Sequence, residues 1–332
     1  MKVRAQGYDR GWLPSWRPPV PCISVGNINW GGSGKTPLCS WLLTWCERLG
    51  LQSAVLTRGY RANPPHLPYY VHPESAVASA GDEPLMLARE HPEAWVVVDP
   101  NRKRAGQWAW QEIRPDVYIL DDGFQHLAVQ RDINLLLFRP EDLSQNWNRV
   151  IPSGPWREGA NALRRASALL FHADPERGHA MAQTVQDRIP QLGVPMFSYS
   201  YHTRGVCKIF DHSPVEPSAT YILVSAVGNP SGVEFSARQV FFDPPLDHMQ
   251  FPDHHPYTSQ DWSIISQRAT ECKARYIVCT PKDKVKLEAV ADSRLCVLDV
   301  CLDIAGEIGQ DHEFGQWLQD EMHKGKARHR TG

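Results

Sequence analysis

The sequence predicts an α/β protein with a P-loop NTPase-like, mostly parallel sheet flanked by helices, together with a second, smaller α/β lobe. Short runs of apolar and β-branched residues alternate with longer stretches that suit helices. Strands that are apolar throughout are typical of parallel sheets covered on both faces. In addition, a glycine-rich stretch follows the first apolar run and precedes a helix-compatible one, which is the order of a phosphate-binding loop.

Apolar runs that fit buried strands are spread along the whole chain. A domain boundary is expected between about Pro195 and Thr220, where the stretch Tyr199–Val206 suits a crossing strand or a linker. Residues 1–200 are therefore predicted to form the phosphate-binding and catalytic domain. Residues 201–332 are predicted to form a second α/β lobe that closes over the site and ends in a solvated basic tail, Lys324–Arg330. The predicted strands are Pro21–Val25, Ala54–Thr57, Trp95–Asp99, Val117–Asp121, Ile133–Phe138, Ala168–Phe171, Tyr221–Val227, Gln239–Phe242, Tyr276–Thr280 and Leu295–Asp299.

Composition argues against several classes of function. A net charge of -2 over 332 residues gives no global field that would draw the chain onto nucleic acid. None of the eight cysteines belongs to a Cys-x-x-Cys pair, and several lie in apolar runs, which favours a reducing compartment. No run approaches the roughly 18 apolar residues that a membrane-spanning helix needs. The Trp- and Arg-rich segment Tyr8–Pro21 fits a membrane–water interface and a loop packed on the domain equally well.

The glycine-rich stretch is predicted to bind the phosphates of a nucleotide. Glycines let backbone N–H groups curl around phosphate oxygens, and the start of the following helix adds partial positive charge. Lys35 would reach the β- and γ-phosphates, and the hydroxyl of Thr36 would bind Mg²⁺. Asn29 stands where the strict pattern has glycine, and Asn tolerates a left-handed backbone better than most residues. The alternative is a glycine-rich turn that binds no ligand. The predicted nucleotide contacts are Asn29, Trp30, Gly31, Gly32, Ser33, Gly34, Lys35 and Thr36.

Acidic residues suited to a metal ion or to proton transfer occur at three further places. Asp121 and Asp122 end an apolar run, which is where a P-loop protein holds Mg²⁺, although two Asp residues before a glycine also suit a simple turn. Asp82 lies in a Gly-Asp-Glu-Pro motif, where an acid–base role competes with helix capping. The stretch Asp253–His255 puts a histidine beside a carboxylate, which suits either acid–base chemistry or a structural loop.

Taken together, these motifs resemble the tetraacyldisaccharide 4'-kinase family, which phosphorylates a lipid A precursor. The glycine loop with its Val-Gly-Asn prefix and the Asp-Asp-Gly-Phe-Gln-His stretch are specific in combination, and the matches run in family order from about residue 20 to about residue 290. The matching stretches are SVGNINWGGSGKTP, LTRGYR (Leu56–Arg61), GDEP (Gly81–Pro84), ILDDGFQH (Ile119–His126), RD (Arg131-Asp132), PSGPWRE (Pro152–Glu158), AVGNPSGVEF (Ala226–Phe235), FPDHHPY (Phe251–Tyr257) and TPKDKVKL (Thr280–Leu287).

The resemblance implies an ATP- and Mg²⁺-dependent kinase that phosphorylates the 4'-hydroxyl of a tetraacyldisaccharide 1-phosphate. By similarity, Asp82 is the candidate base that takes the proton of this hydroxyl, His254 orients or tunes Asp82, and Lys35 binds the ATP phosphates. The remaining residues that the resemblance implies are Thr36, Asp121 and Asp122 for the metal, with Arg157, Glu158, Gln125 and His126 in or around the site.

The same resemblance implies a peripheral protein on the cytoplasmic side of the bacterial inner membrane. Its partner is then the lipid disaccharide at the membrane surface, with no nucleic acid and no obligate protein partner. Two positions depart from the family pattern. Pro281 stands where Glu is usual, and Trp156 replaces a smaller apolar residue, so that its ring packs either on the acceptor or on protein.

Two other classes of function compete with a lipid kinase. A P-loop GTPase or nucleotide-dependent switch is the main alternative. Thr280–Asp283 superficially approaches a guanine-recognition motif, but Lys-Asp pairs are common and we attribute this likeness to chance. Comparing ATP with GTP binding separates these two hypotheses. A metal phosphoesterase centred on Asp253–His255 is the third class, and it requires Asp-rich ligand motifs beyond the Asp121-Asp122 pair.

Overall fold

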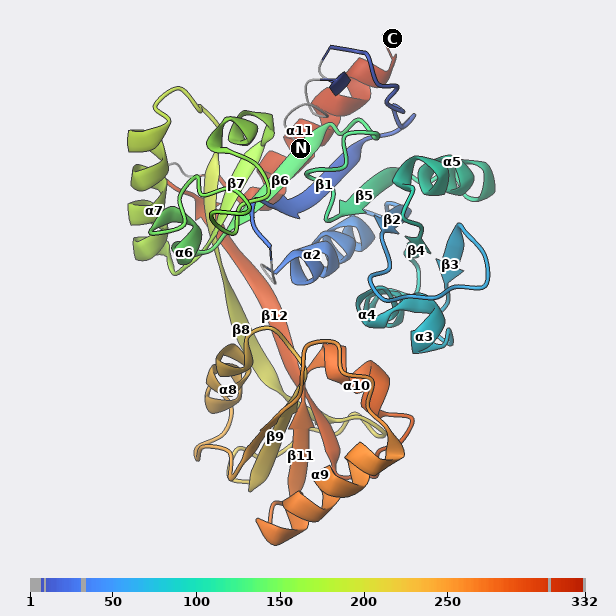
Figure 1. Cartoon of the computed structure of the whole chain (residues 1–332), viewed down its shortest axis with the longest axis vertical. Coiled ribbons are helices and arrows are strands. Elements are labelled where there is room, and N and C mark those ends of the chain that lie inside the picture. The colour runs from blue at the N-terminus through green and yellow to red at the C-terminus, as the bar shows by residue number, and fades with distance from the viewer. Residues whose placement is uncertain (1–6, 9, 31–33, 310–311, 331–332) are drawn as a thin grey trace.

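The computed structural model describes residues 7–8, 10–30, 34–309 and 312–330, and the side chains of the last helix are described as far as residue 326. These residues form two lobes, one above the other in Figure 1, which two long strands connect. The first lobe contains the chain before the first long strand and also the C-terminal helix. The second lobe contains the chain between the two long strands.

The described residues include twelve strands in a single sheet. They are β1 (Cys22–Asn27), β2 (Ser53–Thr57), β3 (Tyr69–Val71), β4 (Trp95–Val98), β5 (Val117–Asp121), β6 (Ile133–Phe138), β7 (Ala168–His172), β8 (Met196–Lys208), β9 (Tyr221–Ser225), β10 (His248–Gln250), β11 (Tyr276–Cys279) and β12 (Leu295–Glu307). Their order is β10-β9-β11-β12-β8-β7-β6-β1-β5-β2-β4-β3. All neighbours are parallel except β8–β12 and β3–β4, which confirms the predicted mostly parallel α/β fold.

Helices cover the sheet and connect its strands. They are α2 (Lys35–Arg48), α3 (Val77–Ala80), α4 (Asp82–Glu90), α5 (Arg102–Glu112), α6 (Pro140–Leu143), the 3₁₀ helix η1 (Ala160–Arg165), α7 (Pro175–Arg188), α8 (Pro230–Arg238), α9 (Ser259–Glu271), α10 (Pro281–Leu287) and α11 (Phe314–Arg330). Several begin with a side chain that accepts a backbone N–H, such as Asn101 for α5 and Thr258 for α9. Helix α2 differs, because its N-cap residue is Gly34.

The two lobes are connected by β8 and β12, which pair antiparallel over most of their thirteen-residue lengths (Figure 1). The start of β8 also pairs with β7 in the first lobe, and the start of β12 pairs with β11 in the second. One hydrogen-bonded ladder therefore runs from lobe to lobe. The predicted crossing stretch Tyr199–Val206 is the middle of β8.

Helix α11 packs on the first lobe, whereas the sequence predicts a second lobe that runs to residue 332. Phe314, Trp317 and Leu318 are buried in the same core cluster as residues of β1 and α2. The ring centroid of Phe314 lies 4.9 Å from that of Phe197 on β8. Because these apolar residues recur at helical spacing, one face of α11 is buried, and the predicted basic tail continues this helix to Arg330.

One predicted strand is wrong. Residues Gln239–Phe242 follow the end of α8 and form a turn, in which Phe242 is 81% exposed. The other predicted strands overlap observed ones, and Val117–Asp121 and Ile133–Phe138 have the predicted bounds. The short strands β3 and β10 were not predicted.

Candidate active site

The described residues of the predicted phosphate loop, Asn29, Trp30 and Gly34, lie between β1 and α2, at the carboxyl ends of the central parallel strands. Gly34 has a φ of 81°, a left-handed conformation that favours glycine, and a Cβ added there would also meet the hydroxyl group of Tyr201 on β8. Because the N-cap has no side chain, it does not occupy the first N–H groups of α2, which suits an anion. The predicted contacts Gly31, Gly32 and Ser33 lie outside the described residues.

Asn29 and Trp30, both predicted to contact the nucleotide, differ in exposure. Asn29 is fully buried, where its amide nitrogen donates to Asp142 and its amide oxygen accepts from Asn27 at 2.6 Å. Trp30 is 61% exposed, with the guanidinium of Arg157 5.2 Å from its ring centroid. Asn29 therefore anchors the loop from inside the protein, while Trp30 presents an open aromatic face beside a cation.

Two cations converge on Asp122. Backbone hydrogen bonds between the Pro-Trp-Arg segment and the start of the phosphate loop bring Arg157 to the site. Its Nη1 donates to both carboxylate oxygens of Asp122 at 2.9 Å and to Gln125 at 3.2 Å. On the same carboxylate, Oδ1 lies 3.5 Å from Nζ of Lys35. Four predicted site residues from three separate motifs are thus neighbours.

The adjacent carboxylates Asp121 and Asp122 differ electrostatically. Burial raises the pKa of Asp121 to about 6, and the negative charges of Glu83 and Asp122 act in the same direction. Burial also acts to raise the pKa of Asp122, but Lys35 and Arg157 outweigh it and hold that pKa below its ordinary value. Asp121 is therefore the carboxylate whose ionised form an added divalent cation would stabilise most.

Thr36 does not bond to either of these aspartates but donates its hydroxyl to Oε2 of Glu83 at 2.8 Å. The other carboxylate oxygen of Glu83 lies 3.1 Å from Nζ of Lys282. Glu83 is the second residue of α4, and Lys282 belongs to α10. A single carboxylate thus links the phosphate-loop helix to the second lobe.

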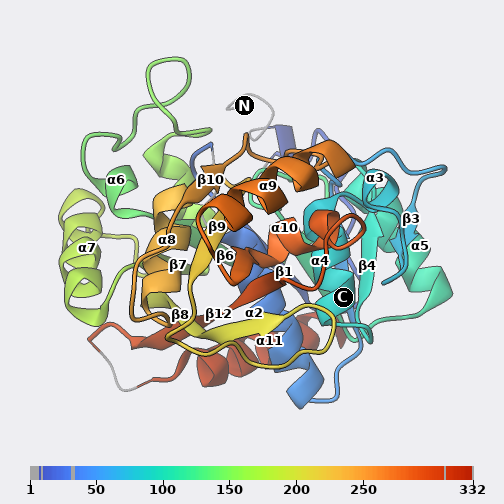
Figure 2. The same ribbon diagram turned by 90° about the horizontal axis from the view of Figure 1, so that it is seen from below.

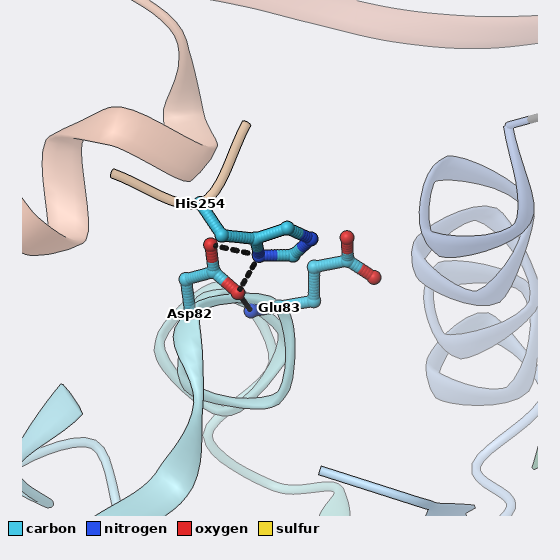
Figure 3. A group of neighbouring side chains, drawn as sticks. All are labelled: Asp82, Glu83 and His254. Carbon is cyan, nitrogen blue, oxygen red and sulfur yellow. Dashed lines mark hydrogen bonds and ion pairs between the residues drawn. The ribbon is translucent and has the colours of Figure 1, made fainter. Parts of the chain in front are cut away.

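Asp82 and His254 form a hydrogen-bonded pair across the two lobes (Figure 3). Asp82 is the buried first residue of α4 in the first lobe. His254 lies between β10 and α9 in the second lobe, with a φ of 62°. Its Nδ1 is 2.8 Å from Oδ2 and 3.0 Å from Oδ1 of Asp82. Helices α4 and α10, one from each lobe, also contact each other (Figure 2).

A lysine ammonium group lies among these side chains. Nζ of Lys282 is 3.1 Å from Nε2 of His254, 3.0 Å from Oδ1 of Asp253 and 4.0 Å from Oδ2 of Asp82. Asp82, Glu83 and His254 have ligand-type atoms within 4.8 Å of one another, and Nζ of Lys282 contacts two of these side chains, Glu83 and His254. Burial acts to raise the pKa of Asp82, and the hydrogen bond from His254 and the charge of Lys282 outweigh it and lower that pKa.

Two further predicted site residues, Glu158 and His126, form contacts with arginines outside the groups around Asp122 and Asp82. Glu158 is buried and accepts from Nη2 of Arg165 at 2.7 Å, so its charge is neutralised within the protein. His126 lies in the turn after β5, where its backbone N–H donates to Gly123 and its carbonyl accepts from Arg131. Glu158 therefore has a structural ion pair, and His126 stays a predicted site residue by its position.

Two alternatives from the sequence are resolved by burial. Asp283, the acidic residue of the guanine-like motif, is fully buried and accepts from the backbone N–H of Ala226 and from the hydroxyl of Thr280. It therefore has no surface for a nucleotide base. Trp156 is fully buried against Phe138 and Trp147, so its ring packs on protein and not on the acceptor.

Sequence reasoning missed three residues at the site. Glu83 and Lys282 stand inside the quoted motifs GDEP and TPKDKVKL, but nothing local predicts that they meet. Arg102 is buried at the start of α5, and its Nη2 donates to the backbone carbonyl of Asp121 at 3.4 Å. A basic triplet marks Arg102 in the sequence, although the pattern does not show that only its first member is buried.

Comparisons with known proteins show to which family the chain is similar. A family model described as tetraacyldisaccharide-1-P 4'-kinase matches residues 1–323. A protein of Nitratidesulfovibrio vulgaris named tetraacyldisaccharide 4'-kinase is 45% identical, over 100% of this chain and 93% of that protein. One of the same name from Oleidesulfovibrio alaskensis is 41% identical, over 96% and 90%. A solved structure described as an "apo" form of LpxK from Aquifex aeolicus in complex with ATP has a TM-score of 0.74 at 26% identity, covering 97% of this chain and 94% of that one.

Proposed function

The chain belongs to the tetraacyldisaccharide 4'-kinase family, and we propose that it transfers the γ-phosphate of ATP to the 4'-hydroxyl of a tetraacyldisaccharide 1-phosphate, forming lipid IVA. It is an enzyme, a kinase. One observation carries the proposal. Glu83 links Thr36 of the phosphate-loop helix to the group that contains Asp82 and His254, so phosphate-binding residues and a pair suited to activate a hydroxyl share one site. The A. aeolicus relative, described in complex with ATP, supports ATP as the donor.

Phosphoryl transfer depends mainly on aligned oxygens and neutralised charge. The N-terminus of α2 offers N–H groups and partial positive charge to the phosphates. Lys35 and Arg157 both form ion pairs with Asp122. When ATP binds, each can form an ion pair with a phosphate group in place of that carboxylate. Trp30 lies next to Arg157 and presents an open ring to the same region.

We propose Thr36, Asp121 and Asp122 as the residues that hold Mg²⁺. The donor set fits, because Asp121 ends β5, Asp122 follows it directly, and burial raises the pKa of Asp121. Thr36 uses its hydroxyl proton in the bond to Glu83, which leaves its oxygen lone pairs available to a cation. When bound, the ion supplies neutralisation of charge on the transferring phosphate. Glu83 then acts by orienting the Thr36 hydroxyl.

We propose Asp82 as the group that takes the proton of the acceptor hydroxyl. Its lowered pKa means that it is ionised at neutral pH and ready to accept a hydrogen bond from that hydroxyl. Since the first N–H groups of α4 also favour a negative charge at its first residue, the helix itself helps to keep Asp82 ionised. His254 fixes the direction of the carboxylate.

The direct test is transfer of labelled γ-phosphate from ATP to a tetraacyldisaccharide 1-phosphate in detergent with Mg²⁺. We expect a labelled lipid product with ATP and much less with GTP, because the guanine-like motif is buried. Matched reactions without the acceptor, and with Lys35→Ala, report background hydrolysis. Release of labelled phosphate at equal rates with and without the acceptor would favour a nucleotide-hydrolysing switch and contradict the kinase assignment.

We also propose that the protein works at a membrane surface. Within the part of the chain that the structure describes, none of the helices is long and apolar enough to cross a bilayer. A groove of about 690 Å³ is lined by Trp16, Arg17, Trp108 and Trp110, among others, and Trp12 is exposed four residues before Trp16. We call these five residues the tryptophan surface. Trp16 and Trp108 pack partly on the core of the first lobe, whereas Trp12 is exposed. Exposed aromatic rings beside arginines suit the headgroup region of an anionic membrane.

Replacing both Trp12 and Trp110 by alanine is expected to weaken binding to vesicles of phosphatidylethanolamine and phosphatidylglycerol by about tenfold, because two amphipathic rings no longer enter the interface. Vesicle flotation measures this loss. Phe242→Ala, which removes an exposed aromatic ring from the second lobe, is the matched control and should bind as the wild type does. Equal binding by all three proteins would contradict the assignment of this surface.

A further inference from the structure

Lys282 has an unusual concentration of contacts for one ammonium group. Its Nζ lies 3.1 Å from Nε2 of His254, 3.1 Å from Oε1 of Glu83 and 3.0 Å from Oδ1 of Asp253. Burial acts to lower the pKa of Lys282, but the facing carboxylates, Glu83 first, outweigh it and raise that pKa. The side chain is therefore charged at neutral pH and acts only as a hydrogen-bond donor.

The contact with Lys282 determines which nitrogen of His254 carries a proton. Because an ammonium group can only donate, Nε2 of His254 must accept and is unprotonated. A neutral imidazole carries its one proton on the other nitrogen, so Nδ1–H donates to Asp82. In this arrangement His254 is a donor to the carboxylate of Asp82.

The same lysine also ties this pair to the phosphate loop. Lys282 contacts Glu83, whose other oxygen accepts the hydroxyl of Thr36 at 2.8 Å. Lys282 and His254 belong to the second lobe, whereas Glu83, Thr36 and Asp82 belong to the first. Bringing α10 against α4 therefore sets the tautomer of the histidine and the direction of the threonine hydroxyl in one step.

We propose that Lys282 is a positioning residue that holds His254 in its Nδ1–H tautomer and thereby orients Asp82 toward the acceptor hydroxyl; this rests on the proposed kinase function. A charge effect on Asp82 alone would be shared with Lys286, whose Nζ lies 3.7 Å from Oδ2 of Asp82. The ion pairs of Lys286 are with Asp82 and Asp283. Among the contacts described for these two lysines, the one to Nε2 of His254 belongs to Lys282.

The tautomer can be measured without any assay of activity. In ¹⁵N-histidine-labelled protein, long-range proton–nitrogen correlation spectra distinguish a protonated from an unprotonated ring nitrogen, and His254→Gln identifies the signal. We expect an unprotonated Nε2 in the wild type and a partly or wholly protonated Nε2 in Lys282→Met. Lys282→Arg, which keeps a donor-only cation, should restore most of the wild-type signal.

The kinetic effect should fall on the chemical step. Lys282→Met is expected to lower kcat about tenfold with KM for ATP changed less than about twofold, a fraction of what a general base contributes. Lys286→Met removes charge near Asp82 and should leave the His254 signal unchanged. Arg89→Met breaks the ion pair with Glu288, which also joins α4 to α10, and should likewise leave it unchanged. Melting temperatures establish that each variant is folded.

The role of Lys282 and the kinase function are contradicted by different results. An unprotonated Nε2 in Lys282→Met, or a protonated Nε2 in the wild type, refutes the role of Lys282 whether or not the kinase assay succeeds. A change of tautomer in Arg89→Met as large as that in Lys282→Met would assign the effect to lobe contact in general and also overturn the proposal. Failure of lipid phosphorylation by the wild type, with the expected tautomers present, counts against the proposed function alone.

Discussion

Lys35→Ala is expected to lower kcat/KM for phosphate transfer by about 10³-fold, which is the scale seen when one preorganised charge-stabilising group is removed from an active site. The lysine begins α2 directly after Gly34, and its Nζ lies 3.5 Å from Asp122 and 3.3 Å from the amide oxygen of Asn27. A cation on a flexible stem at this point can follow the γ-phosphate as its charge redistributes. Initial rates at several ATP concentrations measure the loss.

His254→Ala is expected to lower activity less than Lys35→Ala does. His254 acts on Asp82 through a hydrogen bond, and a general base contributes roughly 10²–10⁴-fold in total, so loss of its orienting partner should cost less than loss of Lys35. Lys35→Ala should also stay folded, because Arg157 continues to neutralise Asp122. If His254→Ala proves as damaging as Lys35→Ala, or more so, positioning of the base outweighs charge neutralisation and our ranking is wrong.

How far the sequence predicts the fold depends on how each strand is buried. Strands Val117–Asp121 and Ile133–Phe138 lie inside the sheet and are almost wholly buried, so their continuous apolar runs define their bounds. Strand β8 is continuously buried only over its first four residues, and the rest of it, where Val206 is the one buried position, lacks such a run. Its length is set by antiparallel pairing with β12, a contact between segments about 100 residues apart that no local pattern contains.

The structure also differs from the prediction at Gln239–Phe242 and at helix α11. Gln239–Phe242 has the composition of a strand, but α8 ends in front of it and Phe242 points into solvent. Helix α11 was assigned to the second lobe because it follows that lobe in the chain. The apolar stripe of α11 predicts that one face of the helix is buried against another element. Strand β12 returns the chain to the first lobe, so that face packs on the first lobe.

The site was predicted as a set of motifs, and the structure adds how they are joined. Asp121 and Asp122 were expected near the phosphate loop, because a P-loop protein holds Mg²⁺ on carboxylates at the end of a neighbouring strand. Glu83 and Lys282 were not, since each belongs to a different lobe and their contact depends on the packing of α4 against α10. Asn29 was predicted to contact the nucleotide. In the structure its side chain is buried and bonds to Asp142, so it anchors the loop from the inside.

Asp122→Asn is expected to lower kcat by about 10²-fold or more while KM for ATP stays level or falls. In the wild type this carboxylate neutralises Lys35 and Arg157, so its loss leaves two cations ready for phosphate and should not weaken ATP binding. What is lost is negative charge beside Asp121, where we place Mg²⁺. Activity should therefore need a higher Mg²⁺ concentration, and titration of Mg²⁺ at saturating ATP measures that shift.

Asparagine is the informative substitution because of the backbone at this position. Asp122 has a φ of 50°, a left-handed conformation that asparagine accepts and that costs most other residues about 1 kcal/mol or more. Asp122→Ala should thus lose stability as well as activity, whereas Asp122→Asn should melt near the wild-type temperature. An Asp122→Asn enzyme with a raised KM for ATP and an unchanged Mg²⁺ requirement would show that this carboxylate serves to align Lys35 and Arg157. Mg²⁺ would then be held by Asp121 and Thr36 without Asp122.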